Sequence, residues 1–147
     1  MATLLLLRLG HLTGNAALED EGHKVLAELG AEIESKPAAY PQMLIALDFA
    51  IGPVKEIVVA GERDDPRTQG LLREARKRFL PNAVFALRPE GANGEAAVRL
   101  IPYLARQTAV RGVPTAYVCE AYACKLPVTD PGKLAPLLDA PAPTPAR

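Results

Sequence analysis

The two cysteines of the chain, Cys119 and Cys124, lie five positions apart in one short segment. Residues 115–119 form an apolar stretch that predicts a strand, which places Cys119 at its end and Cys124 in the following loop. Two thiols this close can form a disulfide, share a metal ion or stay free. A redox helix of the thioredoxin type needs a gap of two residues. The wider spacing does not supply that geometry, but the spacing alone does not choose among the three alternatives. Because a free cysteine behaves as a small hydrophobe, inert, partly buried cysteines are favoured over a redox or metal role.

A metal site needs further ligands, and the chain offers few. Zinc is held by four ligands in structural sites. Besides the cysteines only His11 and His23 are available, both in the N-terminal third and without paired ligand spacing. We therefore predict no metal and no cofactor.

Two glycine-containing turns follow predicted strands, where backbone amides could cradle a phosphate. Residues 91–94 contain two glycines, whereas the dinucleotide fingerprint uses three. Residues 61–65 lack the repeated glycine and carry acidic side chains that would repel a phosphate. Plain turns are favoured at both places.

Basic side chains crowd one predicted helix, with Glu74 as the only acid among them: Arg67, Arg73, Arg76, Lys77 and Arg78. Nucleic-acid contact would normally add aromatic side chains that stack bases. None is interleaved here, and the chain as a whole is neutral, with 17 basic and 17 acidic residues. A solvated face is favoured, with docking of an acidic partner surface as the alternative, and we expect no nucleic-acid partner.

The remaining polar candidates form no complete catalytic set. Asp48 and Glu56 could do carboxylate chemistry only if they faced a shared cavity. Ser35, the only serine, has no nucleophile elbow around it. Tyr103, Tyr117 and Tyr122 are typical of packing residues with a polar tip. No catalytic residue is assigned.

Length and composition predict one compact domain over residues 1–140, because 147 residues that are 49% hydrophobic bury a single core. The proline-rich tail, residues 141–147, is expected to be disordered. The apolar run at residues 4–7 is interrupted by Arg8, so we predict neither a signal peptide nor a membrane helix. Two cysteines without an export signal favour a cytoplasmic location.

Hydrophobic periodicity predicts an α/β fold with three N-terminal helices followed by a small three-stranded sheet. The helical part spans residues 1–52, with Gly14 as a left-handed cap and Asn15 as the next amino-terminal cap. The α/β part spans residues 53–140 and contains a βαβ unit with a right-handed crossover. The predicted helices are residues 2–12, 16–33, 38–51, 66–80, 95–104 and 131–138, and the predicted strands are 56–60, 83–87 and 115–119.

Some details of these elements can be checked one by one. Leu71, Leu72, Ala75 and Phe79 should form the buried stripe of the helix that Pro81 and Asn82 close. Thr129 or Asp130 should cap the last helix. Pro102 places the end of the helix over residues 95–104 in question, because proline has no backbone N–H to donate.

Several blocks carry a family resemblance over nearly the whole chain. They are residues 5–14, 40–48, 56–61 and 78–82, and above all residues 115–119 together with Cys124, Pro127 and Asp130. The chain resembles the C-terminal part of the thioredoxin-domain-containing family that includes the spermatogenesis-associated thioredoxin-like proteins. Members look like an N-terminal thioredoxin-like domain, then a helical toroid similar to sugar epimerases and six-hairpin glycosidases, then a small α/β element.

The resemblance implies that residues 1–52 are the last toroid helices and residues 53–140 the appended element. The Cys-x-x-Cys pair, the thioredoxin-like domain and most of the toroid are absent from this sequence, so the family activity does not carry over intact. We expect a non-catalytic C-terminal module that acts in assembly or partner contact and is not an enzyme on its own. The alternatives are a thiol redox or metal role through Cys119 and Cys124, or sugar handling with the toroid supplied by a partner.

The same reasoning predicts a partner. The hydrophobic stripes on the first three helices exceed what a three-stranded sheet covers, so another surface should bury the remainder. We therefore expect a homo-oligomer or a companion chain that carries the rest of the family architecture.

Overall fold

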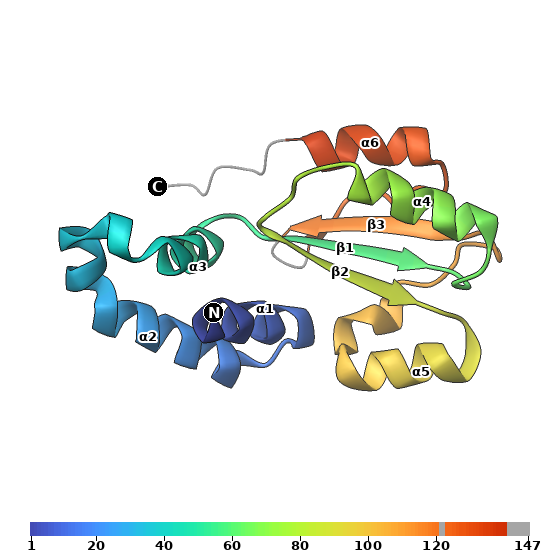
Figure 1. Cartoon of the computed structure of the whole chain (residues 1–147). Helices are drawn as coiled ribbons and strands as arrows, with labels where there is room; N and C mark the ends of the chain where they lie inside the picture. Colours follow the sequence, from blue (N-terminus) through green and yellow to red (C-terminus); the bar gives the residue numbers. More distant parts are fainter. Residues whose placement is uncertain (121–122, 141–147) are drawn as a thin grey trace. The chain divides into compact units, whose positions relative to one another are not determined.

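The computed structural model describes residues 1–120 and 123–140 (Figure 1). The chain divides into two compact units, Met1–Gly52 and Pro53–Arg147, and each is described by itself. The expectation of one compact domain stays a prediction. The tail whose disorder was predicted, residues 141–147, lies outside the described residues.

The helical unit consists of three α-helices and one short 3-10 turn. Gly14 ends the first helix in the left-handed conformation, with φ of 68°, and its N–H donates to the Gly10 carbonyl. The Asn15 side chain accepts from the N–H of Ala17 and caps the second helix. Both capping predictions are confirmed. The elements are α1 (Ala2–Thr13), α2 (Ala16–Ser35), η1 (Pro37–Ala39) and α3 (Pro41–Ile51).

The first two helices pack closely, and the third begins later than predicted. A Cβ built on Gly22 of α2 would lie 2.7 Å from Cγ of Leu7 on α1, so the missing side chain permits the close approach of the two helices. The 3-10 turn η1 takes up the residues before Pro41. Because proline is favoured at the first helical position, α3 begins at Pro41 and not at residue 38.

The α/β unit contains a four-stranded mixed sheet in the order β2-β1-β3-β4. Strand β1 pairs parallel with β2 and antiparallel with β3, and β3 pairs antiparallel with β4. The predicted α/β class is confirmed. The predicted number of three strands is wrong, because the sheet also contains the short strand β4. The elements are β1 (Lys55–Ala60), α4 (Pro66–Arg76), β2 (Ala83–Arg88), α5 (Gly91–Leu100), η2 (Pro102–Arg106), β3 (Thr115–Glu120), β4 (Ala123–Cys124) and α6 (Pro131–Asp139).

The core of this unit lies on one face of the sheet. Alternate residues of a strand point to one face, so Ile57 and Val59 of β1 face the same side. Figure 1 shows α4 and α6 on one side of the sheet and α5 on the other. The buried core cluster consists of Ile57, Val59, Leu71, Ala75, Ala83, Ala116, Val118, Leu134 and Leu138. The opposite face therefore receives Glu56 from β1 and Cys119 from β3.

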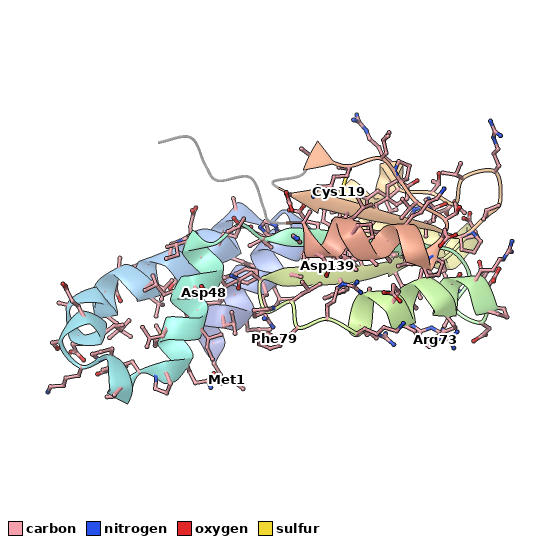
Figure 2. The ribbon with its side chains drawn as sticks, turned by 90° about the horizontal axis from the view of Figure 1, so that it is seen from above. Met1, Asp48, Arg73, Phe79, Cys119 and Asp139 are labelled. Carbon is pink, nitrogen blue, oxygen red and sulfur yellow. A yellow bond between two sulfur atoms is a disulfide. The ribbon has the colours of Figure 1, made fainter. Side chains whose placement is uncertain are left out.

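Helix α4 ends earlier than predicted. The N–H of Lys77 donates to the Glu74 carbonyl three residues back, which closes the helix at Arg76, well before Pro81. Phe79 therefore lies beyond the helix and is 91% exposed (Figure 2), so the predicted buried stripe stops at Ala75.

Helix α5 begins earlier than predicted. Its first residue is Gly91, with φ of 60°, so residues 91–94 form the first helical turn and not a free loop. Pro102 does not extend α5 but opens the separate 3-10 helix η2. The Asp130 side chain accepts from the N–H of Gly132 and caps α6, which confirms that prediction.

Candidate functional site

Cys119 and Cys124 are joined by a disulfide, with the two sulfurs 2.00 Å apart. The spacing left three alternatives open, and the structure has this one. The sequence predicted Cys124 in a loop, but it lies in strand β4. Cys119 is buried, with 1% exposure, whereas Cys124 is exposed. The pair therefore has one sheltered sulfur-bearing residue and one that faces solvent.

Strand register explains why the two residues meet. Cys119 and Cys124 are direct cross-strand partners, with their Cα atoms 3.8 Å apart. The N–H of Lys125 donates to the Val118 carbonyl at 3.0 Å, so the neighbouring pair of residues is the hydrogen-bonded one. Non-hydrogen-bonded pairs of antiparallel strands have the closer side chains. The register therefore brings the two sulfurs together.

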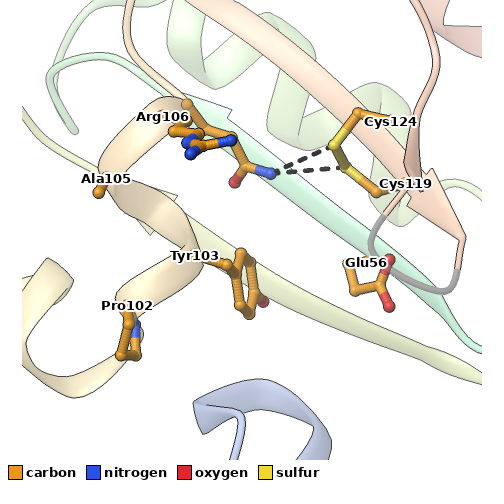
Figure 3. Close-up of a pocket in the computed structure, with 8 residues that line it drawn as sticks. Glu56, Pro102, Tyr103, Ala105, Arg106, Cys119 and Cys124 are labelled. Atoms are coloured by element: carbon orange, nitrogen blue, oxygen red, sulfur yellow. Dashed lines mark hydrogen bonds between the residues drawn. A yellow bond between two sulfur atoms is a disulfide. The ribbon is translucent and has the colours of Figure 1, made fainter.

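A cavity of about 340 Å³ lies beside the disulfide, on the sheet face opposite the core cluster (Figure 3). Glu56 and Cys119 are register partners on β1 and β3, and both contribute to its wall. The 3-10 helix η2 supplies much of the remainder. The volume of the cavity is within the range of small-molecule binding sites. The lining residues are Glu56, Pro102, Tyr103, Ala105, Arg106, Gln107, Cys119 and Cys124.

Gln107 connects η2 to the disulfide. Its Nε2 lies 3.4 Å from Sγ of Cys119 and 3.5 Å from Sγ of Cys124, and donates toward both (Figure 3). The side chain is only 6% exposed, and its Oε1 is buried without a hydrogen-bond partner among the described residues. An unsatisfied buried acceptor costs about 1–3 kcal/mol. The cavity wall therefore holds an amide oxygen that a hydrogen-bond donor could satisfy.

Tyr117 positions the segment that carries Gln107. Its hydroxyl donates to the Thr108 carbonyl at 2.6 Å. Burial raises the pKa of this phenol above its usual value, so it keeps its proton for the bond. The prediction of a packing residue with a polar tip is confirmed for Tyr117. Tyr103 lines the cavity, and Tyr122 lies outside the described residues.

The charges of the cavity are mixed. Glu56 is 1% exposed and takes part in interactions of its own, and Arg106 supplies a guanidinium on the same wall. The neighbouring Lys55 points to the other face of the sheet, outside the cavity, where its ammonium donates to the carbonyls of Leu138 and Ala140 at 2.8 and 2.7 Å. These carbonyls end α6, where a cation is favourable. One carboxylate and one guanidinium leave the cavity wall without net charge.

The histidines lie in the other unit. His11 on α1 has its Nδ1 3.7 Å from a Glu19 carboxylate oxygen and meets the Phe49 ring edge-on. His23 is exposed on α2. Within residues 1–120 and 123–140, no cluster of three or more potential ligands is arranged to hold a metal ion.

In the glycine-containing turns, a side chain of the protein already accepts from a backbone N–H that could otherwise bind a phosphate. An oxygen of the Glu62 carboxylate accepts from the N–H of Glu90 at 2.9 Å, immediately before α5. A carboxylate thus already lies where a phosphate would bind. Gly94 is needed for packing, because a Cβ there would collide with the Pro89 carbonyl oxygen.

Three of the five basic side chains within α4 and directly after it form ion pairs with acidic groups. Arg67 pairs with Asp65 at 2.7 Å, and Lys77 and Arg78 both pair with Glu74 at 2.8 Å. Arg78 also reaches the Asp139 carboxylate on α6 at 2.6 Å. These ion pairs connect α4 to α6. They favour the interpretation of a solvated face and disfavour that of a nucleic-acid-binding surface.

The other polar candidates do not assemble into a site. Asp48 lies in α3 of the helical unit, and Glu56 lies in β1 of the α/β unit. The Ser35 hydroxyl donates to the Glu32 carbonyl at the end of α2. The residue that sequence reasoning missed is Gln107, which belongs to no motif and reaches Cys119 only through the fold. None of the helices in the described parts of the chain is both long and apolar enough to cross a membrane.

The fold and the site define a small α/β unit with a disulfide-lined cavity, joined to a three-helix unit. The chain is similar to spermatogenesis-associated protein 20 from human, rat and mouse, with 33%, 32% and 31% identity over 133 residues. The match covers 90% of this chain and supports a relationship to that family. The chain spans 17% of the length of these relatives.

No family model matches the chain, and no solved structure matches it. The thioredoxin-like and toroid features implied by the resemblance stay predictions.

Proposed function

We propose that the chain is a non-catalytic module of the spermatogenesis-associated protein 20 architecture and acts in assembly by packing against further polypeptide. The supporting observation is an exposed apolar stripe that begins at Met1, the residue before α1, and continues along that helix. Met1, Leu5 and Leu9 follow one another at four-residue spacing and are 86%, 58% and 40% exposed. Residues at this spacing share one helix face. Contiguous apolar surface of this kind marks an interaction site.

Helix α3 of the same unit also exposes apolar side chains. Leu44 and Ile51 are seven residues apart and therefore share a helix face. They are 38% and 75% exposed, and the neighbouring Ile45 is 43% exposed. The relatives are about six times longer than the matched segment, since that segment is 17% of their length. In such proteins a module of this size has further polypeptide to contact. We therefore name polypeptide, either a second copy or the rest of the family architecture, as the occupant.

The test uses a matched pair of double variants in the full chain. Leu5→Gln with Ile45→Gln removes apolar surface from the helical unit. Phe79→Gln with Leu126→Gln removes exposed apolar side chains, 91% and 87% exposed, from the α/β unit. The wild type and the control variant Phe79→Gln with Leu126→Gln should associate in sedimentation velocity over a concentration series. The variant Leu5→Gln with Ile45→Gln should stay monomeric.

A second arm covers a companion chain. The wild type is mixed with the part of human spermatogenesis-associated protein 20 that lies outside the matched segment. Co-sedimentation that the helical double variant abolishes supports the proposal. A wild type that stays monomeric alone and does not bind this companion overturns it.

A second candidate function is a thiol redox role through Cys119 and Cys124. It is favoured by the disulfide on the wall of a cavity that also holds the buried Gln107 amide. Free thiols are counted on the unfolded chain before and after treatment with a reductant. We expect no free thiol before the treatment and two after it. Two free thiols in the untreated protein under air would contradict this candidate.

We also propose a cytoplasmic location. Disulfides in that compartment are usually transient and serve redox chemistry, so the location and the redox candidate support one another. Sugar handling through a toroid supplied by a partner stays a prediction. The test of location is fractionation of cells that produce the chain, and recovery from an oxidising compartment would contradict it.

A further inference from the structure

We propose that the cavity is a site of thiol–disulfide exchange, at which a small neutral dithiol attacks Sγ of Cys124 and Cys119 departs as the thiolate. The proposal rests on the redox candidate above and adds to it the substrate class, the sulfur attacked and the group that stabilises the departing one. The α/β unit supplies every residue that the step requires.

Accessibility selects the sulfur. Cys119 lies in β3, which is flanked by β1 and β4, and is 1% exposed. Cys124 is exposed and belongs to the two-residue edge strand β4. The rate of exchange depends on access of the attacking thiolate to a given sulfur. Attack at Cys124 therefore leaves the sheltered residue as the departing thiolate.

The Gln107 amide stabilises that thiolate. Its Nε2 already donates toward both sulfurs, at 3.4 and 3.5 Å. A hydrogen bond to a charged acceptor is stronger than one to a neutral acceptor, so this contact strengthens when Cys119 becomes anionic. Glu56, the register partner of Cys119, carries a negative charge that opposes a thiolate. The donor from Gln107 offsets this effect at the sulfur itself.

The other end of the same amide fits the attacking molecule. Oε1 of Gln107 is buried on the cavity wall and has no partner within the described ranges. A thiol or hydroxyl group on the dithiol can donate to it. Glu56 and Arg106 supply one charge of each sign, which favours a neutral molecule over a strongly charged one.

The chemistry balances in two steps. In the first, a thiolate of the dithiol forms a bond to Sγ of Cys124 as the protein disulfide breaks, and the electron pair goes to Sγ of Cys119, which then takes up a proton. In the second, the other thiol of the same molecule loses its proton and attacks the mixed disulfide, releasing Cys124 as a thiolate that is then protonated. The dithiol is oxidised to a cyclic disulfide, and the protein disulfide is reduced to two thiols.

The first experiment identifies the sulfur attacked. The full chain is treated with 2-mercaptoethanol, and released thiols are trapped with iodoacetamide. Cleavage after Glu120 separates the two cysteines for mass spectrometry. We expect the mercaptoethanol adduct on Cys124 and the carbamidomethyl group on Cys119. The reverse distribution overturns the proposal.

The second experiment tests Gln107 as a positioning residue. Reduction by dithiothreitol is timed for the wild type, Gln107→Leu and the matched control Gln69→Leu, whose amide donates to the Arg63 carbonyl elsewhere in the unit. Loss of a hydrogen bond to a charged sulfur should slow Gln107→Leu by about tenfold. Gln107→Glu, which keeps the shape but lacks the donor, should also be slow. The control should keep the wild-type rate.

A purely structural role for Gln107 predicts the opposite sign, because a loosened site exposes the disulfide and speeds its reduction. Wild-type or faster reduction of Gln107→Leu therefore overturns the proposal. Failure of the underlying redox candidate is distinct, since it would appear earlier as two free thiols in the untreated protein. Circular dichroism of each variant verifies that the fold is retained.

Discussion

Arg78 is the side chain that ties the two core-covering helices of the α/β unit together. Its Nη1 donates to the Glu74 carbonyl and to the Glu74 carboxylate, and its Nε and Nη2 donate to the two carboxylate oxygens of Asp139. The Arg78 guanidinium lowers the pKa of Asp139. Hydrogen bonds from Lys77 and then Arg78 lower the pKa of Glu74. Both carboxylates are therefore more stable ionised in the folded state.

This arrangement predicts a pH-dependent effect of Arg78→Leu. A carboxylate with a depressed folded pKa contributes stability above its ordinary pKa of about 4, and this contribution is lost as the pH falls through the folded pKa. The variant should be less stable than the wild type near neutral pH, and the difference should shrink toward about pH 2.5. Urea unfolding at several pH values measures it.

The matched control for this prediction is Arg73→Leu in α4, the helix that ends two residues before Arg78. Arg73 is exposed (Figure 2), so its replacement should leave the acid dependence unchanged. A difference between the wild type and Arg78→Leu that stays constant from neutral to acid pH would contradict the assigned role of these ion pairs.

At this scale the sequence located some of the site but could not assemble it. The proximity of Cys119 and Cys124 followed from their spacing, and the Asn15 and Asp130 caps followed from local chemistry. Gln107 could not be predicted, because its contact with Cys119 depends on how η2 packs over the sheet. Long-range contacts of a single polar residue leave no periodic signal.

At the scale of elements, Gly94 shows why α5 can begin where it does. A side chain there would collide with the Pro89 carbonyl oxygen at the entrance of the helix. We predict that Gly94→Ala destabilises the α/β unit by about 1–3 kcal/mol, the usual range for overpacking. Thermal or urea unfolding gives the value.

Gly70→Ala is the control in the same unit. Gly70 lies within α4, and the nearest neighbour of a built Cβ, Cγ of Pro131, is at an ordinary 3.6 Å. Alanine has the higher helix propensity, so this variant should be more stable by about 0.5–1 kcal/mol. Equal effects of the two substitutions would contradict the packing account of Gly94.

The errors in element prediction have physical causes. Strand β4 contains two residues, too few for an alternating pattern, and is recognised only through its pairing with β3. The beginning of α5 contains Gly91 and Gly94, which read locally as a turn. Elements with a strong local signal, the helical periodicity of α2 and the β-branched run of β1, were predicted within one or two residues.

At the scale of the whole molecule, the core cluster of the α/β unit uses only residues between 57 and 138. A unit with its own core can fold alone. We predict that residues 53–147 unfold cooperatively as an isolated fragment, followed by circular dichroism and by urea. A fragment with a gradual, non-cooperative transition would contradict the division at Gly52 and Pro53.

The sequence also predicted a change of character at this position, because helical periodicity gives way to β-branched residues after Pro53. The α/β class followed from the order of these segments and is confirmed. The occupant of the apolar helical surface could not be derived in this way, because a stripe of exposed leucines indicates contact but not the identity of the partner.

The most direct test of assembly through the helical unit is hydrogen exchange of the full chain at low and high concentration, and with the companion segment of human spermatogenesis-associated protein 20. A contact that stabilises α1 and α3 slows exchange of their amides. We predict slower exchange in Ala2–Thr13 and Pro41–Ile51, with the β1 and β3 amides unchanged. Unchanged exchange in both helices under every condition, or slowing confined to the α/β unit, would contradict the proposal.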